Sequence, residues 1–137
     1  MARDIIHEAV KNALEKDGWT ITADPFTLKY EEVEVYADLA AERAIAAERA
    51  GRKIAVEIKS FVGRSPIHDL EVALGQYEIY RSFLELLEPD RELYLAISDH
   101  VYANLFSLKA IQMIVKRYDL AIVAINLETE VVDVWIE

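Results

Sequence analysis

The sequence predicts an α/β (α+β) fold in which a mixed central sheet is flanked by helices. Three observations support this prediction: an amphipathic N-terminal segment, a long capped helix in the middle of the chain, and strand-like segments between and after them. The predicted order is helix, three strands, helix, strand, helix and two strands. The length of 137 residues suits one sizeable core, so we expect a single domain over residues 1–137.

The first two helices are predicted from apolar periodicity and from the residues at their ends. In Ala2–Lys16, apolar side chains recur at helical spacing, and Gly18 supplies a stop signal. Ser65 and Pro66 are a capping hydroxyl and a proline suited to the first helical position. We therefore expect the second helix to begin there and to end near Leu87.

A third helical region is predicted between two strands in the C-terminal third. Ser98 or Asp99 is the candidate cap of a first helical segment and Ser107 of a second, together reaching Arg117. The other segments read as strands because they are bounded by turn residues and are either alternating or continuously apolar. These strands are Trp19–Thr22, Val33–Ala37, Glu92–Ser98, Leu120–Asn126 and Val131–Ile136.

The segment Asp38–Ala50 is compatible with two structures. Its many alanines favour a helix by propensity. AIAAER followed by AGRK and IAVEIK also fits a hairpin with Gly51 at the turn, and we favour this interpretation. Such a hairpin would project the basic residues of this region away from the sheet.

Composition limits the class of protein. The net charge is −10, which argues against a general nucleic-acid coat protein, and there is no cysteine. The N-terminus lacks the apolar core of a signal peptide, and no stretch approaches the length of a membrane span. We therefore expect a soluble, cytoplasmic protein.

The charge is distributed unevenly along the chain. The stretch 43–64 contains six basic residues and only two acids, whereas the stretch from Asp119 to the end contains five acids and no lysine or arginine. A basic hairpin tip is often only a solvated surface, but this one contains a second unusual feature. The basic residues named as candidate phosphate contacts are Arg49, Arg52, Lys53 and Arg64.

The second feature is a carboxylate and an ammonium in a strand that otherwise reads as buried. In IAVEIKS, Ile54–Ser60, the side chains of Glu57 and Lys59 are two residues apart and point to the same face. Magnesium or manganese binds one or two carboxylates together with water and phosphate oxygens, and a nearby ammonium can orient the attacking water. Asp38 is the candidate second metal ligand and Glu8 a candidate third. The alternative is a plain surface ion pair, which contributes at most about 1 kcal/mol.

This combination resembles the PD-(D/E)xK nuclease superfamily and its restriction-endonuclease-like fold. The resemblance is carried by Asp38 and by Glu57-Ile58-Lys59 after a first helix that contains Glu8. Gln76 and Tyr80 are four residues apart on one helix face and are similar to the Q-x-x-x-Y motif of RecB-like members. The resemblance implies catalytic roles for Asp38, Glu57, Lys59 and Gln76, and a place for Tyr80 beside the DNA. The proline that often precedes the aspartate in this superfamily is absent here.

A narrower resemblance covers nearly the whole chain. RDIIHEAVKNALEKDGW, AVEIKSF, ALGQYEIYR and VVDVWIE resemble the XisH family, the fdxN-element excision controlling factors of cyanobacteria. The resemblance implies a role in excising a DNA element, together with other excision proteins such as the small partner XisI. It does not imply by itself that this chain cuts DNA.

Two functional hypotheses follow. In the first, the chain is a Mg²⁺-dependent (or Mn²⁺-dependent) DNA endonuclease in which Gln76 supports Lys59. In the second, it is a non-catalytic accessory factor on a nuclease-like scaffold that binds a partner protein through its acidic C-terminal part and regulates site-specific recombination. The charge of −10, unusual for a protein that grips DNA unaided, motivates the second hypothesis.

Overall fold

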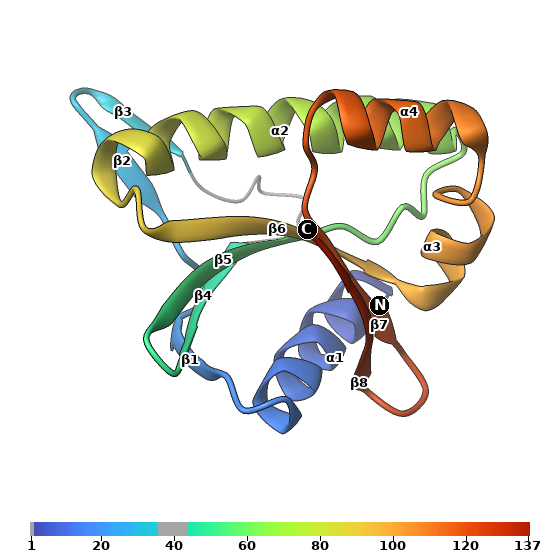
Figure 1. Cartoon of the computed structure of the whole chain (residues 1–137), viewed down its shortest axis with the longest axis horizontal. Coiled ribbons are helices and arrows are strands. Elements are labelled where there is room, and N and C mark those ends of the chain that lie inside the picture. Colours follow the sequence, from blue (N-terminus) through green and yellow to red (C-terminus); the bar gives the residue numbers. More distant parts are fainter. Residues whose placement is uncertain (1, 36–43) are drawn as a thin grey trace.

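The computed structural model describes residues 2–35 and 44–137 and contains a mixed six-stranded sheet with helices on both faces (Figure 1). The sheet order is β1-β4-β5-β6-β7-β8, and β2 and β3 form a separate two-stranded sheet. The elements are α1 (Ala2–Lys16), β1 (Thr20–Ala23), β2 (Leu28–Tyr30), β3 (Val33–Val35), β4 (Ala44–Arg49), β5 (Arg52–Ile58), α2 (Pro66–Leu87), β6 (Arg91–Ser98), α3 (Asp99–Asn104), α4 (Lys109–Arg117), β7 (Ile122–Asn126) and β8 (Val131–Ile136).

The middle of the sheet is parallel and both of its sides are antiparallel. β5 pairs with β6, and β6 with β7, in the parallel sense, and the connections between them are α2 and the α3–α4 region. β1 with β4, β4 with β5, and β7 with β8 are antiparallel. This arrangement confirms the predicted mixed sheet flanked by helices. It makes β5 an interior strand, with β4 on one side and β6 on the other.

β5 is apolar on both faces because both faces of the sheet are covered. On one face, Ile54, Val56 and Ile58 are fully buried in a cluster with the apolar side chains of α1. On the other face, Ala55 belongs to a cluster built from α2, β6, β7 and part of α4. Alternation along the strand therefore directs Glu57, like Ala55, toward the α2 side of the sheet.

The hairpin interpretation of the segment before β5 is confirmed for its described part. β4 and β5 pair from Arg49 with Arg52 through to Ala44 with Glu57. The turn residues Ala50 and Gly51 have φ angles of 49° and 84°. A two-residue turn with positive φ at both positions matches the twist of the strands that it joins.

The sequence prediction missed one strand before α2. It expected a single strand over residues 33–37, whereas β2 and β3 form a short hairpin, and residues 36 and 37 lie outside the described part. β2 has only three residues, and two of them are exposed, so no alternation can develop. The turn uses Glu31 at a φ of 56° in place of the glycine that usually marks such a turn.

The third helical region divides into two helices, as predicted, but only one of the predicted caps is present. The Ser98 hydroxyl accepts the backbone N–H of Val101 at 3.1 Å and caps α3. The predicted cap Ser107 is wrong, because α4 begins one residue later and its N-cap, Leu108, makes no side-chain hydrogen bond. Within residues 2–35 and 44–137, no helix is long and apolar enough to cross a membrane.

The cap of α2 provides a test of the fold. The Ser65 hydroxyl accepts the backbone N–H of His68 at 3.1 Å, and Pro66 follows at the first helical position. We predict that Ser65→Ala lowers the free energy of unfolding by about 1 kcal/mol, as is typical when an N-cap is lost. Ser107→Ala is the matched control and should change it by less than about 0.5 kcal/mol. Urea unfolding measures both, and equal effects of the two variants would contradict the assignment of the caps.

Candidate functional site

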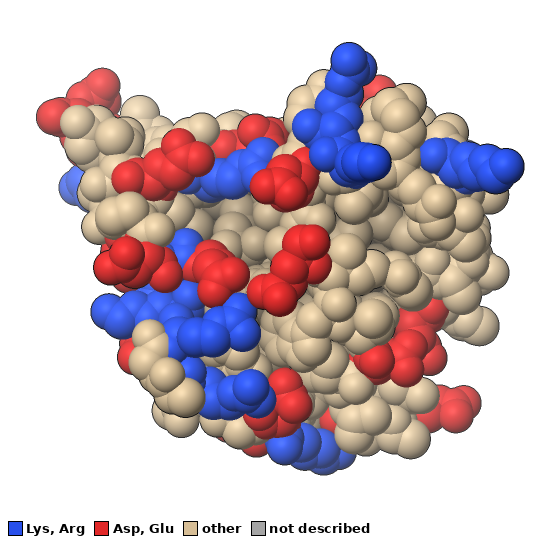
Figure 2. Space-filling view, viewed as in Figure 1, with Lys and Arg blue, Asp and Glu red and all other residues tan. Residues whose placement is uncertain are grey.

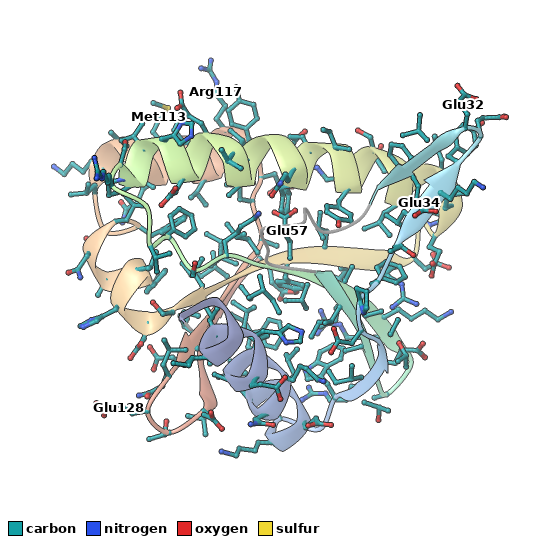
Figure 3. All side chains as sticks on the ribbon, turned by 180° about the vertical axis from the view of Figure 1, so that it is seen from behind. Glu32, Glu34, Glu57, Met113, Arg117 and Glu128 are labelled. Atoms are coloured by element: carbon teal, nitrogen blue, oxygen red, sulfur yellow. The ribbon has the colours of Figure 1, made fainter. Side chains whose placement is uncertain are left out.

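Glu57 lies inside the protein on an interior strand. Its exposed fraction is 3%, and its backbone pairs with Ala44 on one side and Leu95 on the other. Figure 3 shows the Glu57 side chain in the layer between the sheet and α2. A buried carboxylate in an apolar strand is costly for the folded state, which makes its presence informative about function.

Lys59 follows Glu57 by two residues, which is one period of strand alternation. The backbone N–H of Lys59 donates to the carbonyl of Ala96 at 3.0 Å, so the pairing with β6 continues past the last residue of β5. Because the backbone stays extended here, we expect Lys59 to point to the side that Glu57 faces. Lys59 is half-buried. The placement of a carboxylate and an ammonium on one face therefore stays a prediction, with which the continued pairing to β6 agrees.

α2 brings a tyrosine close to this carboxylate. Tyr80 is buried on the inner face of α2, and burial together with the negative charge of Glu57 raises the pKa of Tyr80 to about 12. Tyr80 is therefore a neutral phenol at physiological pH. Gln76 lies one helical turn before Tyr80 and is half-buried. The predicted Q-x-x-x-Y pair thus lies on the helix that covers Glu57.

The described part of the chain places neither of the other two predicted metal ligands, Asp38 and Glu8, beside Glu57. Asp38 lies outside the described part of the chain. Glu8 belongs to α1, which packs on the other face of the sheet; its side chain is 62% exposed and approaches the His7 ring at 3.4 Å. Among residues 2–35 and 44–137, no group of three or more His, Asp or Glu side chains is placed to hold a metal ion. The donor that is described, a buried carboxylate, is nevertheless of the kind that Mg²⁺ and Mn²⁺ bind.

Two of the predicted phosphate contacts are engaged with acids at the far end of β5. Arg52 contacts Glu92 at 3.0 Å and Glu137 at 3.3 Å, and Arg49 approaches Asp17 at 3.5 Å. Figure 2 shows acidic side chains interspersed with the basic ones over this hairpin. The end at which Arg49, Arg52 and the exposed Lys53 lie is about 16 Å along the strand from Glu57. The sequence prediction grouped these residues with Glu57 because they are close to it in sequence. It did not consider that they lie at the opposite end of the strand.

Arg64 lies at the other end of β5, in the segment that leads from Lys59 to α2. The neighbouring Gly63 donates its backbone N–H to Asp69 at 2.9 Å, which ties this segment to the first turn of α2. A Cβ at Gly63 would lie 2.6 Å from the same carboxylate, so a larger residue here would displace the Asp69 side chain from this position. Arg64 is exposed and follows Lys59 by five residues. Among the predicted phosphate contacts on the chain, it is therefore the one next to the Glu57 end.

A second cluster of charged residues was not predicted. His7 is buried, and its Nε2 lies 3.0 Å from Asp24, whose other oxygen is 2.9 Å from the ammonium of Lys11. Burial opposes ionisation of Asp24, but the Lys11 and His7 contacts outweigh it and lower the Asp24 pKa below its ordinary value of 3.8. The Asp24 contact raises the Lys11 pKa. The available signal was the spacing of His7 and Lys11, four residues apart on one helix face.

The link between Glu57 and Tyr80 generates a spectroscopic prediction. In Glu57→Gln, one of the two causes that raise the Tyr80 pKa is removed, so this pKa should fall below about 12. Alkaline titration of tyrosinate absorbance measures it, and subtraction of the same titration in Tyr80→Phe isolates Tyr80 from the other tyrosines. An unchanged Tyr80 titration in Glu57→Gln would show that the two groups are not close.

The Asp24 cluster generates a pH-dependence. Because the Asp24 pKa is lower in the folded than in the unfolded chain, its carboxylate stabilises the protein above pH 3.8, and this contribution disappears as the pH falls through the lowered value. We predict that Asp24→Asn lowers the free energy of unfolding at pH 7 by about 1–3 kcal/mol, and that the difference from wild type shrinks in acid.

Urea unfolding over a pH series measures this effect. Asp17→Asn is the matched control, since the Asp17–Arg49 pair is exposed and should contribute no more than about 1 kcal/mol. An effect of Asp24→Asn that is equal at neutral and acidic pH would contradict an ionised Asp24 as its source.

Comparison with known proteins places this geometry in a family. The chain is similar to an XisH family protein from Nostoc punctiforme PCC 73102, with 40% identity and a TM-score of 0.90 over 98% of this chain and 100% of that one. It is also similar to a fdxN element excision controlling factor protein from Anabaena variabilis, with 43% identity, a TM-score of 0.90 and the same coverage. No curated protein sequence matches the chain. The XisH protein family model matches residues 1–133, and the chain belongs to the XisH family.

Proposed function

We propose that this chain acts in the excision of a DNA element as a metal-dependent endonuclease of the PD-(D/E)xK type, on a restriction-endonuclease-like fold. The observation that carries the proposal is Glu57, a carboxylate that is 3% exposed on an interior strand and whose charge raises the pKa of the nearby Tyr80. Strand alternation predicts that Lys59, two residues later, shares the face of Glu57. A plain surface ion pair does not explain this arrangement, because Glu57 is not at the surface. The biological context comes from the Anabaena variabilis relative, which is described as a fdxN element excision controlling factor.

The strand order supports the fold assignment. The β4–β5 hairpin is followed by the crossover helix α2 and by β6, which lies parallel to β5. The carboxylate lies on the second strand of that hairpin and the lysine directly after its last residue. The glutamine and tyrosine lie on the crossover helix. The same order of elements and motifs carries the resemblance to the nuclease superfamily.

Each residue of the proposed site has a distinct task. Glu57 supplies carboxylate oxygens to the cation, with Asp38 as a further proposed ligand. Glu8 lies on α1 at the opposite face of the sheet and is not one of the proposed ligands. A bound Mg²⁺ or Mn²⁺ lowers the pKa of a bound water and neutralises charge on the phosphate. Lys59 donates hydrogen bonds to the water or to the phosphate, where it stabilises the developing negative charge. Tyr80 remains a neutral phenol and covers Glu57 from α2, and Gln76 holds the Lys59 ammonium in place.

We propose that DNA reaches this site from the end of β5 at which Arg64 lies. Arg64 is exposed there and can contact a phosphate without breaking a described ion pair. Arg49 and Arg52 are already engaged with acids, so they and Lys53 form at most a secondary contact with a long DNA molecule. With a net charge of −10, the chain gains from a basic partner during excision, and a small XisI-like protein is our candidate.

The engagement of Arg49 and Arg52 with acids favours a second candidate function. If the chain grips DNA poorly by itself, its contribution to excision is that of an accessory factor that binds a partner and regulates recombination. The two functions differ in one measurable respect, since only the first includes hydrolysis of a phosphodiester bond by this chain.

Incubation of the purified chain with supercoiled, linear and branched DNA in Mg²⁺ or Mn²⁺ tests the proposal. We predict cleavage that requires the cation and that falls by about a hundredfold or more in Lys59→Ala, the size of effect seen when one transition-state donor is lost. Lys29→Ala is the matched control, because Lys29 is exposed on β2 and belongs to none of the proposed contacts. Cleavage that persists in Lys59→Ala would contradict the mechanism. No cleavage of any DNA form by wild type would favour the accessory role.

A further inference from the structure

α2 carries a second apolar stripe opposite to the one that packs on the sheet. The buried side chains of its inner face are Leu70, Ala73, Tyr77, Tyr80 and Leu84. On the opposite face, Val72, Ile79 and Leu86 follow one another at intervals of seven residues, and the last two are 51% and 64% exposed. Seven residues are close to two helical turns, so these three side chains form one continuous row, the α2 stripe. An exposed apolar row of this length marks an interaction surface.

Gly75 lies in the middle of the same helix face, and no close contact within the described residues explains why this position is a glycine. Apart from its two chain neighbours and the adjacent backbone of its own helix, a Cβ added at Gly75 would meet no atom of the described residues within 4 Å. Glycine destabilises a helix interior relative to alanine, so its presence at an open position has a cost that the folded monomer does not recover. Close approach of a second backbone from outside the molecule gives Gly75 a use. Ser82, seven residues after Gly75, places a second small side chain along the same line of the helix.

α2 and α4, which lie on the same side of the sheet, carry charges of opposite sign. Glu71, Glu78 and Glu85 recur at seven-residue intervals along one line of α2. Glu71 and Glu85 are exposed, and the half-buried Glu78 pairs with Arg81. α4 presents the opposite charge, since Lys109, Lys116 and Arg117 are exposed on it. Figure 3 shows Met113 and Arg117 of α4 projecting away from the sheet, and Figure 2 shows the basic side chains standing out over this helix. Met113 is 53% exposed, so α4 also presents apolar surface.

We propose that the outer faces of α2 and α4 form an interface between two copies of this chain, in which α2 of each copy lies over α4 of the other. α2 and α4 run in the same direction on one side of the sheet (Figure 1), so a two-fold axis along them exchanges the two helices. Glu71 and Glu78 are seven residues apart, and so are Lys109 and Lys116; both intervals span about 10 Å. The two rows therefore have the same spacing, so glutamates of α2 can lie opposite lysines of α4 in the other copy.

The charges select this arrangement over the alternatives. Stacking α2 directly on α2 of a second copy would place two rows of glutamates against each other. A basic helix from a different protein would match α2 but would leave the basic face of α4 opposed by like charge. The exchanged arrangement covers the α2 stripe and Met113 and at the same time brings acids of α2 opposite bases of α4. This inference does not depend on the proposed nuclease chemistry.

Light scattering and sedimentation of the full chain, from low to high micromolar concentration, test the interface. We predict a mass that rises from monomer to dimer. Gly75→Ala should raise the melting temperature, because alanine favours the helix, and should weaken the dimer, because the added methyl group separates the backbones. A chain that remains monomeric throughout the concentration range would overturn the proposal, and so would a dimer that Gly75→Ala strengthens.

A charge exchange tests the pairing of α2 with α4. Glu71→Lys and Lys109→Glu should each weaken the dimer by about tenfold, because each places like charges together, and the double variant should restore it. Circular dichroism and melting temperatures show whether the variants fold, and both positions are exposed, so folding should be unaffected. A double variant that is weaker than either single variant would overturn the α2-on-α4 arrangement.

Discussion

The structure is organised around a carboxylate that is kept inside it. Glu57 occupies one position of a strand whose other buried positions are all apolar, and that strand is covered by helices on both faces. Replacement of a buried charge by an apolar residue of similar volume often stabilises a protein, so folding alone gives no reason for Glu57. A site that needs a dry, fixed carboxylate does give one.

α2 connects the site with the outer surface. Its inner face supplies Tyr80 to the surroundings of Glu57, and its outer face carries the α2 stripe. The segment that joins β5 to α2 is fixed by the hydrogen bond between Gly63 and Asp69, so the site and the helix keep a defined relation. A partner bound to the outer face of α2 therefore contacts the same helix that covers Glu57. Dimerisation on α2 and α4 would place two such sites in one particle, on opposite sides of the interface.

Much of the fold was predictable because it depends on local patterns. α1 and α2 have the predicted bounds, since apolar periodicity and a Ser-Pro cap are local signals, and β8 begins and ends at the predicted residues. β2 was missed because three residues are too few to show alternation, and Ser107 was wrongly assigned as a cap because α4 begins after Leu108 without a side-chain hydrogen bond.

The candidate site was predictable only in part. The same-face relation of Gln76 and Tyr80 follows from helix periodicity, and strand alternation predicts the same relation for Glu57 and Lys59. The grouping of Arg49 and Arg52 with Glu57 could not be checked by spacing, because residues close in sequence can lie at opposite ends of a strand. The contact between Asp24, His7 and Lys11 joins a helix to the chain after β1, and no local pattern predicts such a tertiary contact.

Titration of the chain with Mn²⁺, followed by calorimetry, tests most directly the claim that Glu57 is buried for a cation. The account predicts one saturable site in wild type, its loss in Glu57→Gln, and its retention in Lys59→Ala, since the lysine is not a ligand. Equal Mn²⁺ binding by wild type and by Glu57→Gln would contradict it.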